Sequence, residues 1–166
     1  IERTDFEETP PKGFFRLFVG NKVRLKYGHV IECTGFSKDA AGNVTEVQAT
    51  VVPDTKSGTP GSASVKVKGV ITWVAAADAQ TAEVRLYDRL FTAEHPDAGG
   101  KDHMASLNPN SLKIIQAIVE PTLATAKPDA KYQFERHGYF VADRVDSVEG
   151  KPVFNLAVGL KDSWVK

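Results

Sequence analysis

The sequence predicts an all-β protein built from short antiparallel strands. β-Branched and aromatic residues recur in short runs along the 166-residue chain, and each run is bounded by Gly, Pro, Asn or Asp. Apolar and polar residues alternate inside several of these runs, which is typical of strands that place one face against a core. No segment repeats at a fixed period, so the strands are not expected to form a repeat array.

The first strands are expected near the N-terminus. Residues 21–36 predict one or two strands, in which Gly28 and Gly35 are available for a bend or a bulge. The turn at residues 39–43 then leads into a strand over residues 44–52. Because this turn is short, the strands on its two sides are expected to pair as a hairpin.

A loop and a further strand follow the hairpin. Residues 53–64 are rich in Gly, Ser, Thr and Pro, which predicts an exposed, mobile loop. Residues 65–74 predict a strand whose inward and outward faces exchange at Gly69. Residues 75–80 predict a helical turn or a connector, and we place a domain boundary there.

The C-terminal part of the chain contains the remaining strands. Residues 111–120 fit both the strand and the helix period, but Pro109 and Pro121 on either side favour a short strand. Short helical turns are expected within residues 102–107 and 121–130. The other predicted strands cover residues 83–91, 132–135, 138–145 and 152–159.

The charge balance excludes a strongly basic carrier of nucleic acid. Lys plus Arg and Asp plus Glu both total 21, so the net charge is zero at neutral pH. The charge is nevertheless uneven, because residues 12–30 contain no Asp or Glu. This run is either a nucleic-acid footprint or a solvated strand face, and its basic residues are Lys12, Arg16, Lys22, Arg24 and Lys26.

Composition also restricts the class of protein. Hydrophobic residues make up 42% of the chain, which is enough to bury a core. The single cysteine, Cys33, excludes an internal disulfide, and no apolar run approaches the ~20 residues that a membrane span requires. We therefore expect a cytoplasmic protein with no membrane contact. The chain starts with Ile1 and not with Met, so we also expect it to be part of a longer protein.

No catalytic, metal or cofactor site is predicted. A phosphate-binding loop requires clustered glycines ahead of a helix, and the sequence has no such spacing. The four histidines lie far apart, and Cys33 has no second thiolate beside it, so a metal site is not expected. Scattered Ser, His and Asp residues lack the motif that would identify a nucleophile. The chain is expected to bind a ligand and not to catalyse a reaction.

Four motifs, in order along the chain, are similar to those of a known family. They cover residues 66–74, 84–91, 132–140 and 151–155. They resemble the C-terminal anticodon-binding region of bacterial glutaminyl-tRNA synthetase, and the resemblance runs from Arg3 to Trp164. It implies two small antiparallel β-barrels, like those of a ribosomal protein that binds 5S rRNA. We place the barrels at residues 1–80 and 81–166, and it stays open whether strands upstream of this chain complete the second one.

The resemblance also implies a function. The chain is expected to bind the anticodon loop of tRNA-Gln, as a monomer, for a glutamine–tRNA ligase. A separate N-terminal catalytic domain would attach glutamine with ATP and Mg²⁺, and the nucleotide motifs of such a domain are absent from this chain. Two alternatives are the equivalent region of a β-barrel-type glutamyl-tRNA synthetase and a free-standing structural protein that binds ribosomal RNA.

Five residues match family positions that contact the anticodon. By resemblance, Arg24 and Lys26 correspond to contacts with the first base, although Lys26 replaces an arginine and loses its planar fork. Gln133 and Arg136 correspond to contacts with the central uridine, and Arg16 with the third-position guanosine. Carboxamide and guanidinium groups suit the exposed edges of unstacked bases. Arg24, Lys26, Gln133 and Arg136 are expected to face a common cleft.

Each residue also has an ordinary structural alternative. Arg24 and Lys26 could solubilise a strand face, Gln133 could satisfy a backbone group, and Arg136 could form an ion pair with an acidic neighbour, Glu135 or Asp143. Four other basic residues of the matching motifs are assigned to the surface or to ion pairs: Lys66, Lys68, Arg85 and Arg89. Phosphate contact is an alternative for Lys66 and Lys68.

The chain departs from the family at two positions of the third-base site. Gly13 and Phe15 stand where well-known bacterial members carry Gln and Lys. Phe15 could replace a charge contact with stacking, or it could enter the core, and we favour the core interpretation.

Overall fold

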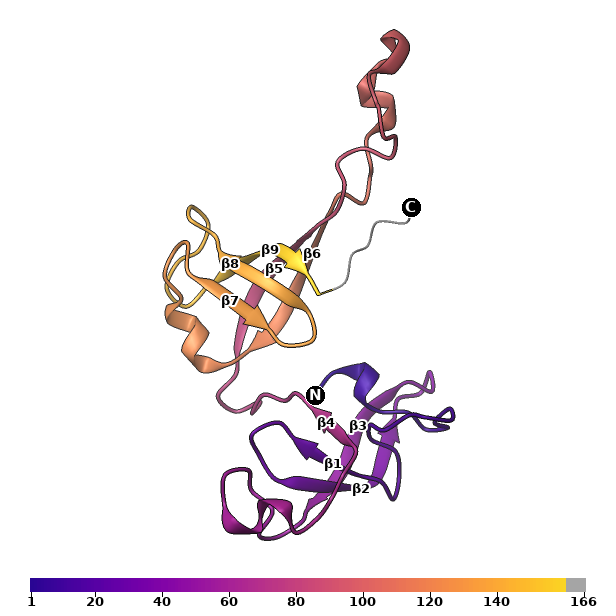
Figure 1. Cartoon of the computed structure of the whole chain (residues 1–166), viewed down its shortest axis with the longest axis vertical. Coiled ribbons are helices and arrows are strands. Elements are labelled where there is room, and N and C mark those ends of the chain that lie inside the picture. Colours follow the sequence, from indigo (N-terminus) through magenta and orange to yellow (C-terminus); the bar gives the residue numbers. More distant parts are fainter. Residues whose placement is uncertain (161–166) are drawn as a thin grey trace. The chain divides into compact units, whose positions relative to one another are not determined.

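The computed structural model describes residues 1–160 (Figure 1). The chain divides into two units: the first spans Ile1–Trp73, and the second begins at Val74. The division falls a few residues before the boundary that we placed after residue 80. The C-terminal end of the family resemblance, at Trp164, lies outside the described residues. Within residues 1–160, no helix is long and apolar enough to cross a lipid bilayer.

The first unit contains a four-stranded sheet of order β3-β2-β1-β4. β1 and β2, and likewise β2 and β3, pair antiparallel, whereas β1 and β4 pair parallel. Two short 3₁₀ helices accompany the sheet, η1 (Arg3–Asp5) and η2 (Pro60–Ala63). The strands are β1 (Lys22–Leu25), β2 (Val30–Lys38), β3 (Val44–Val51) and β4 (Gly69–Ile71).

Strand alternation builds the core of the first unit. In β1, Val23 is fully buried, whereas Lys22 and Arg24 point to the other face of the sheet. The segment before β1 also contributes to the core, because Phe6 and Leu17 form a parallel bridge that brings both side chains inward. The buried cluster consists of Phe6, Leu17, Val23, Ile31, Cys33 and Ile71.

The second unit contains a five-stranded sheet of order β6-β5-β9-β8-β7. Only the β5–β9 pair is parallel among the described strand pairs of this sheet. The segment between β5 and β6 extends away from the sheet and carries η3 (Ala98–Gly100) and η4 (His103–Ser106) (Figure 1). η5 (Pro121–Thr125) precedes β7. The strands are β5 (Gln80–Tyr87), β6 (Leu112–Val119), β7 (Lys131–Phe134), β8 (Gly138–Ala142) and β9 (Val153–Gly159).

Aromatic rings fill the core of the second unit. Phe154 of β9 is fully buried and contacts Tyr132 and Phe134 of β7 edge-on. Phe134 also stacks on Phe140, with ring centroids 4.5 Å apart. Burying side chains of this size contributes about 1.5–3 kcal/mol each, so these rings are a principal source of stability for the unit.

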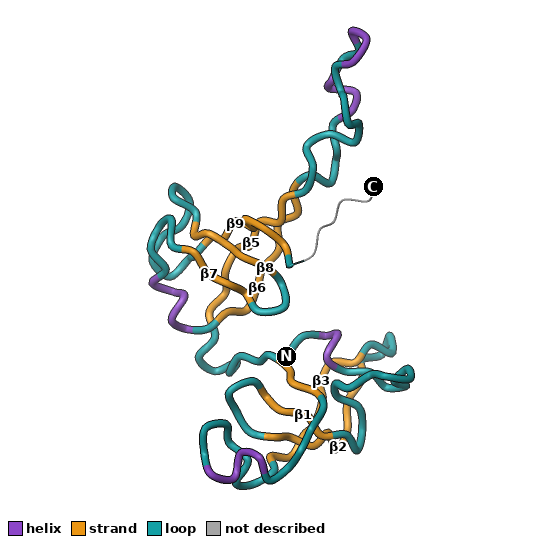
Figure 2. Tube along the Cα trace, in the orientation of Figure 1, coloured by secondary structure: helices purple, strands orange, loops and turns teal. Residues whose placement is uncertain are grey.

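The all-β class is confirmed, but the closed antiparallel barrels are not found. Each sheet has two end strands that are not bonded to each other in the described part of the chain, and each sheet contains one parallel pair. In the first unit, the expected strand over residues 65–74 forms only at Gly69–Ile71. Most of the preceding residues are loop (Figure 2), and β4 pairs with β1 and not with β3 in the described part of the chain.

Gly69 fixes where β4 meets the rest of the first unit. A Cβ atom at this position would lie 1.9 Å from the carbonyl oxygen of Phe15 and 3.1 Å from a methyl group of Val23. We expect Gly69→Ala to destabilise the unit by about 1–3 kcal/mol, because backbone has to shift. The measurement is the free energy of unfolding in urea.

Gly35→Ala is the matched control for this substitution. A Cβ at Gly35 would meet only the end of the Gln48 side chain, which can rotate away. The explanation fails if both variants unfold at the same urea concentration.

Candidate nucleic-acid interface

Arg24 holds a loop of its own unit. Its guanidinium donates hydrogen bonds to the carbonyl oxygens of Thr55 at 2.6 Å, Ser62 at 2.5 Å and Gly28 at 3.2 Å. It also donates to the hydroxyl of Ser57 at 3.4 Å. In this structure the half-buried side chain of Arg24 is directed at its own loop. Its assignment as an RNA contact stays a prediction.

Hydrogen bonds of Thr55 and Ser57 attach the loop over residues 53–64 to the rest of the first unit, although most of its residues are exposed. Thr55 is fully buried; its hydroxyl accepts from the amide of Val30 at 2.9 Å and donates to the carbonyl of Val52 at 2.7 Å. Ser57 donates from its amide to the carbonyl of Gly28 at 3.0 Å. Sequence reasoning missed this because loop composition does not reveal which polar side chain becomes buried.

The acid-free run of residues 12–30 is partly neutralised by acids from outside it. Arg16 lies 3.6 Å from the carboxylate of the buried Asp5 and donates to the carbonyl of Thr4 at 3.0 Å. Lys22 pairs with Glu32 across the β1–β2 ladder at 3.2 Å. Local charge along the sequence therefore overstates the net charge on this surface.

Lys26 lies at the β1–β2 turn beside two exposed aromatic residues. Its ammonium is 5.3 Å from the ring centroid of Tyr27, and its carbonyl accepts from the indole of Trp73 at 3.0 Å. Tyr27 is 76% exposed and has a left-handed backbone, with φ of 60°. Neither aromatic residue was among the predicted site residues, although Trp73 lies within an apolar run and Tyr27 precedes a glycine.

Gln133 and Arg136 lie on β7 and on the turn that follows it. Gln133 is exposed and pairs in register with Tyr139 of β8, whereas Tyr132 and Phe134 point into the core. The alternation predicted for this strand is therefore confirmed. Arg136 has φ of 71°, an uncommon backbone for a residue other than glycine, at the point where the chain reverses into β8.

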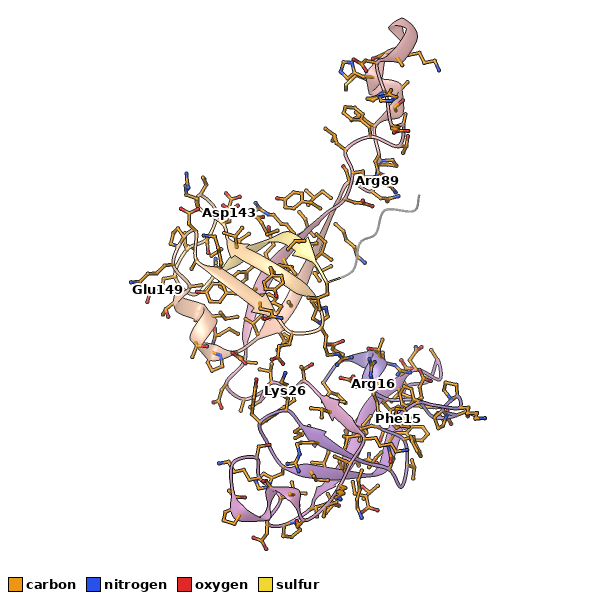
Figure 3. The ribbon with its side chains drawn as sticks, in the orientation of Figure 1. Phe15, Arg16, Lys26, Arg89, Asp143 and Glu149 are labelled. Carbon is orange, nitrogen blue, oxygen red and sulfur yellow. The ribbon has the colours of Figure 1, made fainter. Side chains whose placement is uncertain are left out.

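The five predicted residues divide between the two units. Arg16, Arg24 and Lys26 belong to the first unit, and Gln133 and Arg136 belong to the second. Figure 3 labels Arg16 and Lys26 in the first unit. The common cleft that we expected Arg24, Lys26, Gln133 and Arg136 to face stays a prediction.

Phe15 does not enter the core, so the interpretation that we favoured is wrong. Its side chain is 49% exposed, and the ammonium of Lys68 lies 5.0 Å from its ring centroid. The neighbouring Leu17 takes the core position instead. Figure 3 labels Phe15 beside Arg16 in the first unit.

An ion-pair network occupies the second unit. Arg85 contacts Glu83 and Asp146 at 2.7 Å each, which matches the ion-pair alternative for this residue. Backbone amides of Asp146 and Val145 and the side chain of Asn155 donate to Asp143 and lower its pKa to about 2. These ion pairs and hydrogen bonds lie on the outer face of the sheet and stabilise the second unit.

No metal-binding group was found in the described residues. Among residues 1–160, no three His, Cys, Asp or Glu side chains converge in a way that could hold a metal ion. The predicted site residues supply cations and a carboxamide, and exposed aromatic rings lie beside Lys26. Such groups suit single-stranded RNA.

Comparison with known protein families shows to which family the chain belongs. A family model described as tRNA synthetases class I (E and Q), anti-codon binding domain, matches residues 70–143. A second model with the same description matches residues 1–52. The chain belongs to this family. Together the two matched ranges take in more than half of this anticodon-binding chain and reach into both units.

Curated relatives of the anticodon-binding chain are glutamine–tRNA ligases. The chain is 70% identical over 166 residues to the enzyme of Ralstonia pickettii, and the match covers 100% of the chain and 29% of the relative. It is 64% identical over 164 residues to that of Bordetella avium, covering 99% of the chain and 28% of the relative. The anticodon-binding chain thus spans less than a third of the length of these relatives.

Replacing Arg24 in this anticodon-binding chain tests its role in holding the loop. We expect Arg24→Gln to lower the free energy of unfolding by about 1–3 kcal/mol, because the carbonyls of Thr55 and Ser62 lose a charged donor. Arg24→Lys is expected to restore only part of this loss, because an ammonium lacks the guanidinium fork. Urea unfolding measures both effects.

Arg144→Gln is the control, since Arg144 forms only an exposed pair with Asp129 among the contacts described for it. Such pairs contribute about 0–1 kcal/mol. Equal losses for Arg24→Gln and Arg144→Gln would contradict the loop-holding role.

Asp143 gives the anticodon-binding chain an acid-sensitive contribution to stability. Its pKa is lowered from 3.8 to about 2 in the fold, so the contribution is present above about pH 4 and is lost as pH falls toward about pH 2. We expect Asp143→Asn to cost on the order of 1 kcal/mol near neutral pH and progressively less in acid.

The measurement is urea unfolding from about pH 5 to about pH 2. Asp97→Asn, in the exposed segment between β5 and β6, is the charge-matched control. A difference between wild type and Asp143→Asn that does not shrink in acid would refute this role of Asp143.

Proposed function

We propose that this chain is the anticodon-recognition region of a glutamine–tRNA ligase and binds the anticodon loop of tRNA-Gln. A catalytic domain elsewhere in the ligase would attach glutamine with ATP and Mg²⁺. The observation that carries the proposal is the 70% identity to a glutamine–tRNA ligase over all 166 residues. The two anticodon-binding family matches agree with it.

The exposed side chains support a readout of bases by this chain. Gln133 presents a carboxamide on the outer face of β7, where it can offer one donor and one acceptor to the Watson–Crick edge of a base. Arg136, on the next turn, can form two parallel bonds or stack on a base. In this proposal the pair selects the central base of the anticodon.

The first unit would contribute cations and an ordered loop. Lys26 provides charge at the β1–β2 turn next to Tyr27. Arg24 would act indirectly, because its guanidinium keeps residues 55–62 in the position that RNA meets. Arg16 is oriented by Asp5 and by the carbonyl of Thr4, and would contact the third base.

The remaining features of the proposal rest on the family resemblance. We propose that the complete ligase acts in the cytoplasm as a monomer, with the catalytic domain on the N-terminal side of this chain. Size-exclusion chromatography with light scattering on the complete protein tests the monomer.

Substitution at the second unit tests the RNA contacts. In the complete protein, we expect Gln133→Ala and Arg136→Ala each to lower kcat/KM for tRNA by roughly 5- to 150-fold, because a well-placed base contact contributes about 1–3 kcal/mol of discrimination. Aminoacylation kinetics with tRNA-Gln measure the effect. Arg144→Ala, an exposed arginine of the same unit that pairs with Asp129, is the control.

Unchanged kinetics in both variants would remove these two residues from the interface. Charging with glutamate in place of glutamine would favour the glutamyl-tRNA synthetase alternative. A gel shift with 5S rRNA and none with the anticodon stem-loop would favour the ribosomal RNA alternative.

A further inference from the structure

The end of β4 and the segment after it hold the turn between β1 and β2. The amide of Lys26, in this turn, donates to the carbonyl of Ile71 at 2.9 Å. The indole of Trp73 donates to the carbonyl of Lys26 at 3.0 Å. Both backbone hydrogen-bonding groups of Lys26 are thus bonded to residues that lie far from it in the sequence, at or just after the end of β4.

The indole of Trp73 also packs on the turn. Gly28 is buried, and a Cβ atom on it would lie 3.6 Å from Cζ2 of Trp73, which is an ordinary van der Waals distance. The carbonyl of Gly28 accepts from the amide and the hydroxyl of Ser57, at 3.0 and 3.1 Å. Two distant segments therefore fix the turn: the loop over residues 53–64 and the residues that follow β4.

The turn needs this support because its backbone is strained. Tyr27 has φ of 60°, in the left-handed region where a residue with a Cβ atom is less stable than glycine. Such a backbone persists only where surrounding contacts determine it, and it is found preferentially at functional sites. Tyr27 is 76% exposed, so burial of its own side chain does little to offset the strain. The contacts to Lys26 and Gly28 maintain the conformation instead.

The carbonyl that Trp73 binds belongs to one of the five predicted RNA contacts, Lys26. We infer that Trp73 is a positioning residue for Lys26. The hydrogen bond from its indole keeps the turn in the conformation that presents the Lys26 ammonium to the first base of the anticodon. Trp73 acts through Lys26 and needs no contact of its own with the RNA. This inference rests on the proposed function and adds a residue that none of the predicted contacts includes.

A lysine depends on such positioning more than an arginine does. Its ammonium ends a flexible four-carbon chain and lacks the planar guanidinium fork, so fewer of its contacts are set by its own shape. In this turn the ammonium of Lys26 lies 5.3 Å from the ring centroid of Tyr27, which favours one direction of the chain. The ring and the start of the lysine chain both belong to the turn that Trp73 holds. A change in the turn therefore moves the ring and the ammonium together.

Trp73→Phe in the complete protein tests the inference, because it removes the indole N–H and retains an aromatic ring. We expect it to weaken binding of the anticodon stem-loop of tRNA-Gln by roughly 2- to 12-fold, which corresponds to the loss of one neutral hydrogen bond. Fluorescence anisotropy with labelled RNA gives the dissociation constants. Urea unfolding, followed in parallel, establishes that the variant is folded under the binding conditions.

The loss should be selective for the first base of the anticodon. Changing that base should weaken binding to Trp73→Phe by a smaller factor than binding to the wild type. Changing the central base, the proposed partner of Gln133 and Arg136, should weaken binding to both proteins by the same factor. The ratio of the affinities for two RNAs does not depend on the fraction of protein that is folded, so this measurement holds even for a destabilised variant.

A double-mutant cycle with Lys26→Gln separates positioning from a general structural role. Where Lys26 has been replaced, Trp73→Phe should have no further effect on binding. A purely structural loss would weaken binding by the same factor in both backgrounds and for every RNA.

Tyr87→Phe is the matched control. Tyr87 is an exposed aromatic residue of the second unit, and its hydroxyl donates to Asn155 at 3.1 Å. The variant also removes one donor and keeps the ring, and we expect it to bind every RNA like the wild type.

The outcomes separate the inference from the proposed function. With wild-type protein that binds the stem-loop, Trp73→Phe that binds equally well overturns the inference and leaves the proposed function intact. The same holds for a loss that is equal for every RNA, for one that persists in the Lys26→Gln background, or for Lys26→Gln that binds like the wild type. Folded wild-type protein that binds neither the stem-loop nor tRNA-Gln overturns both.

Discussion

The contact between Arg24 and the carbonyls of the 53–64 loop is the interaction on which the first unit depends. β1 and β4 are neighbours and run parallel. The chain therefore has to leave the sheet after β3 and cross back to the end at which β1 begins before it can form β4. Residues 52–68 make this crossing with little regular structure of their own. Arg24 and the buried Thr55 hold the crossing against β1 and β2. The amide of Ser57, which donates to the carbonyl of Gly28, adds a further contact between the crossing and the rest of the unit.

The second unit also contains a parallel strand pair between distant parts of the sequence, and apolar packing holds this pair in place instead of buried polar contacts. β5 and β9 are parallel neighbours although most of the unit's sequence separates them. Phe154 of β9 packs against rings from β7, while Val84 of β5 lies in the same cluster. Apolar burial fixes the pairing in this unit, and the polar side chains of β7 stay on its outer face. Gln133 is consequently exposed by the same alternation that buries Tyr132 and Phe134.

Local patterns in the sequence were enough to predict most strands and the all-β class. The alternation around Gln133, the strand between Pro109 and Pro121 and the first hairpin were all found where expected. The features that were missed depend on contacts between distant residues. Phe15 was expected in the core because it is apolar, but Leu17 is bridged to Phe6 and takes that place. The contact of Arg24 with the loop was also not foreseen, because its partners Thr55, Ser57 and Ser62 lie 31 to 38 positions later in the chain and no local pattern marks them.

Among the described strands, β6 is an end strand of the sheet in the second unit. Three large apolar side chains, Leu112, Ile114 and Ile118, are exposed on this strand. An unprotected strand of this composition can add a strand from another molecule through its free amides and carbonyls. β6 is therefore a site where copies of the chain can aggregate at high concentration, and a charged residue introduced there would improve solubility.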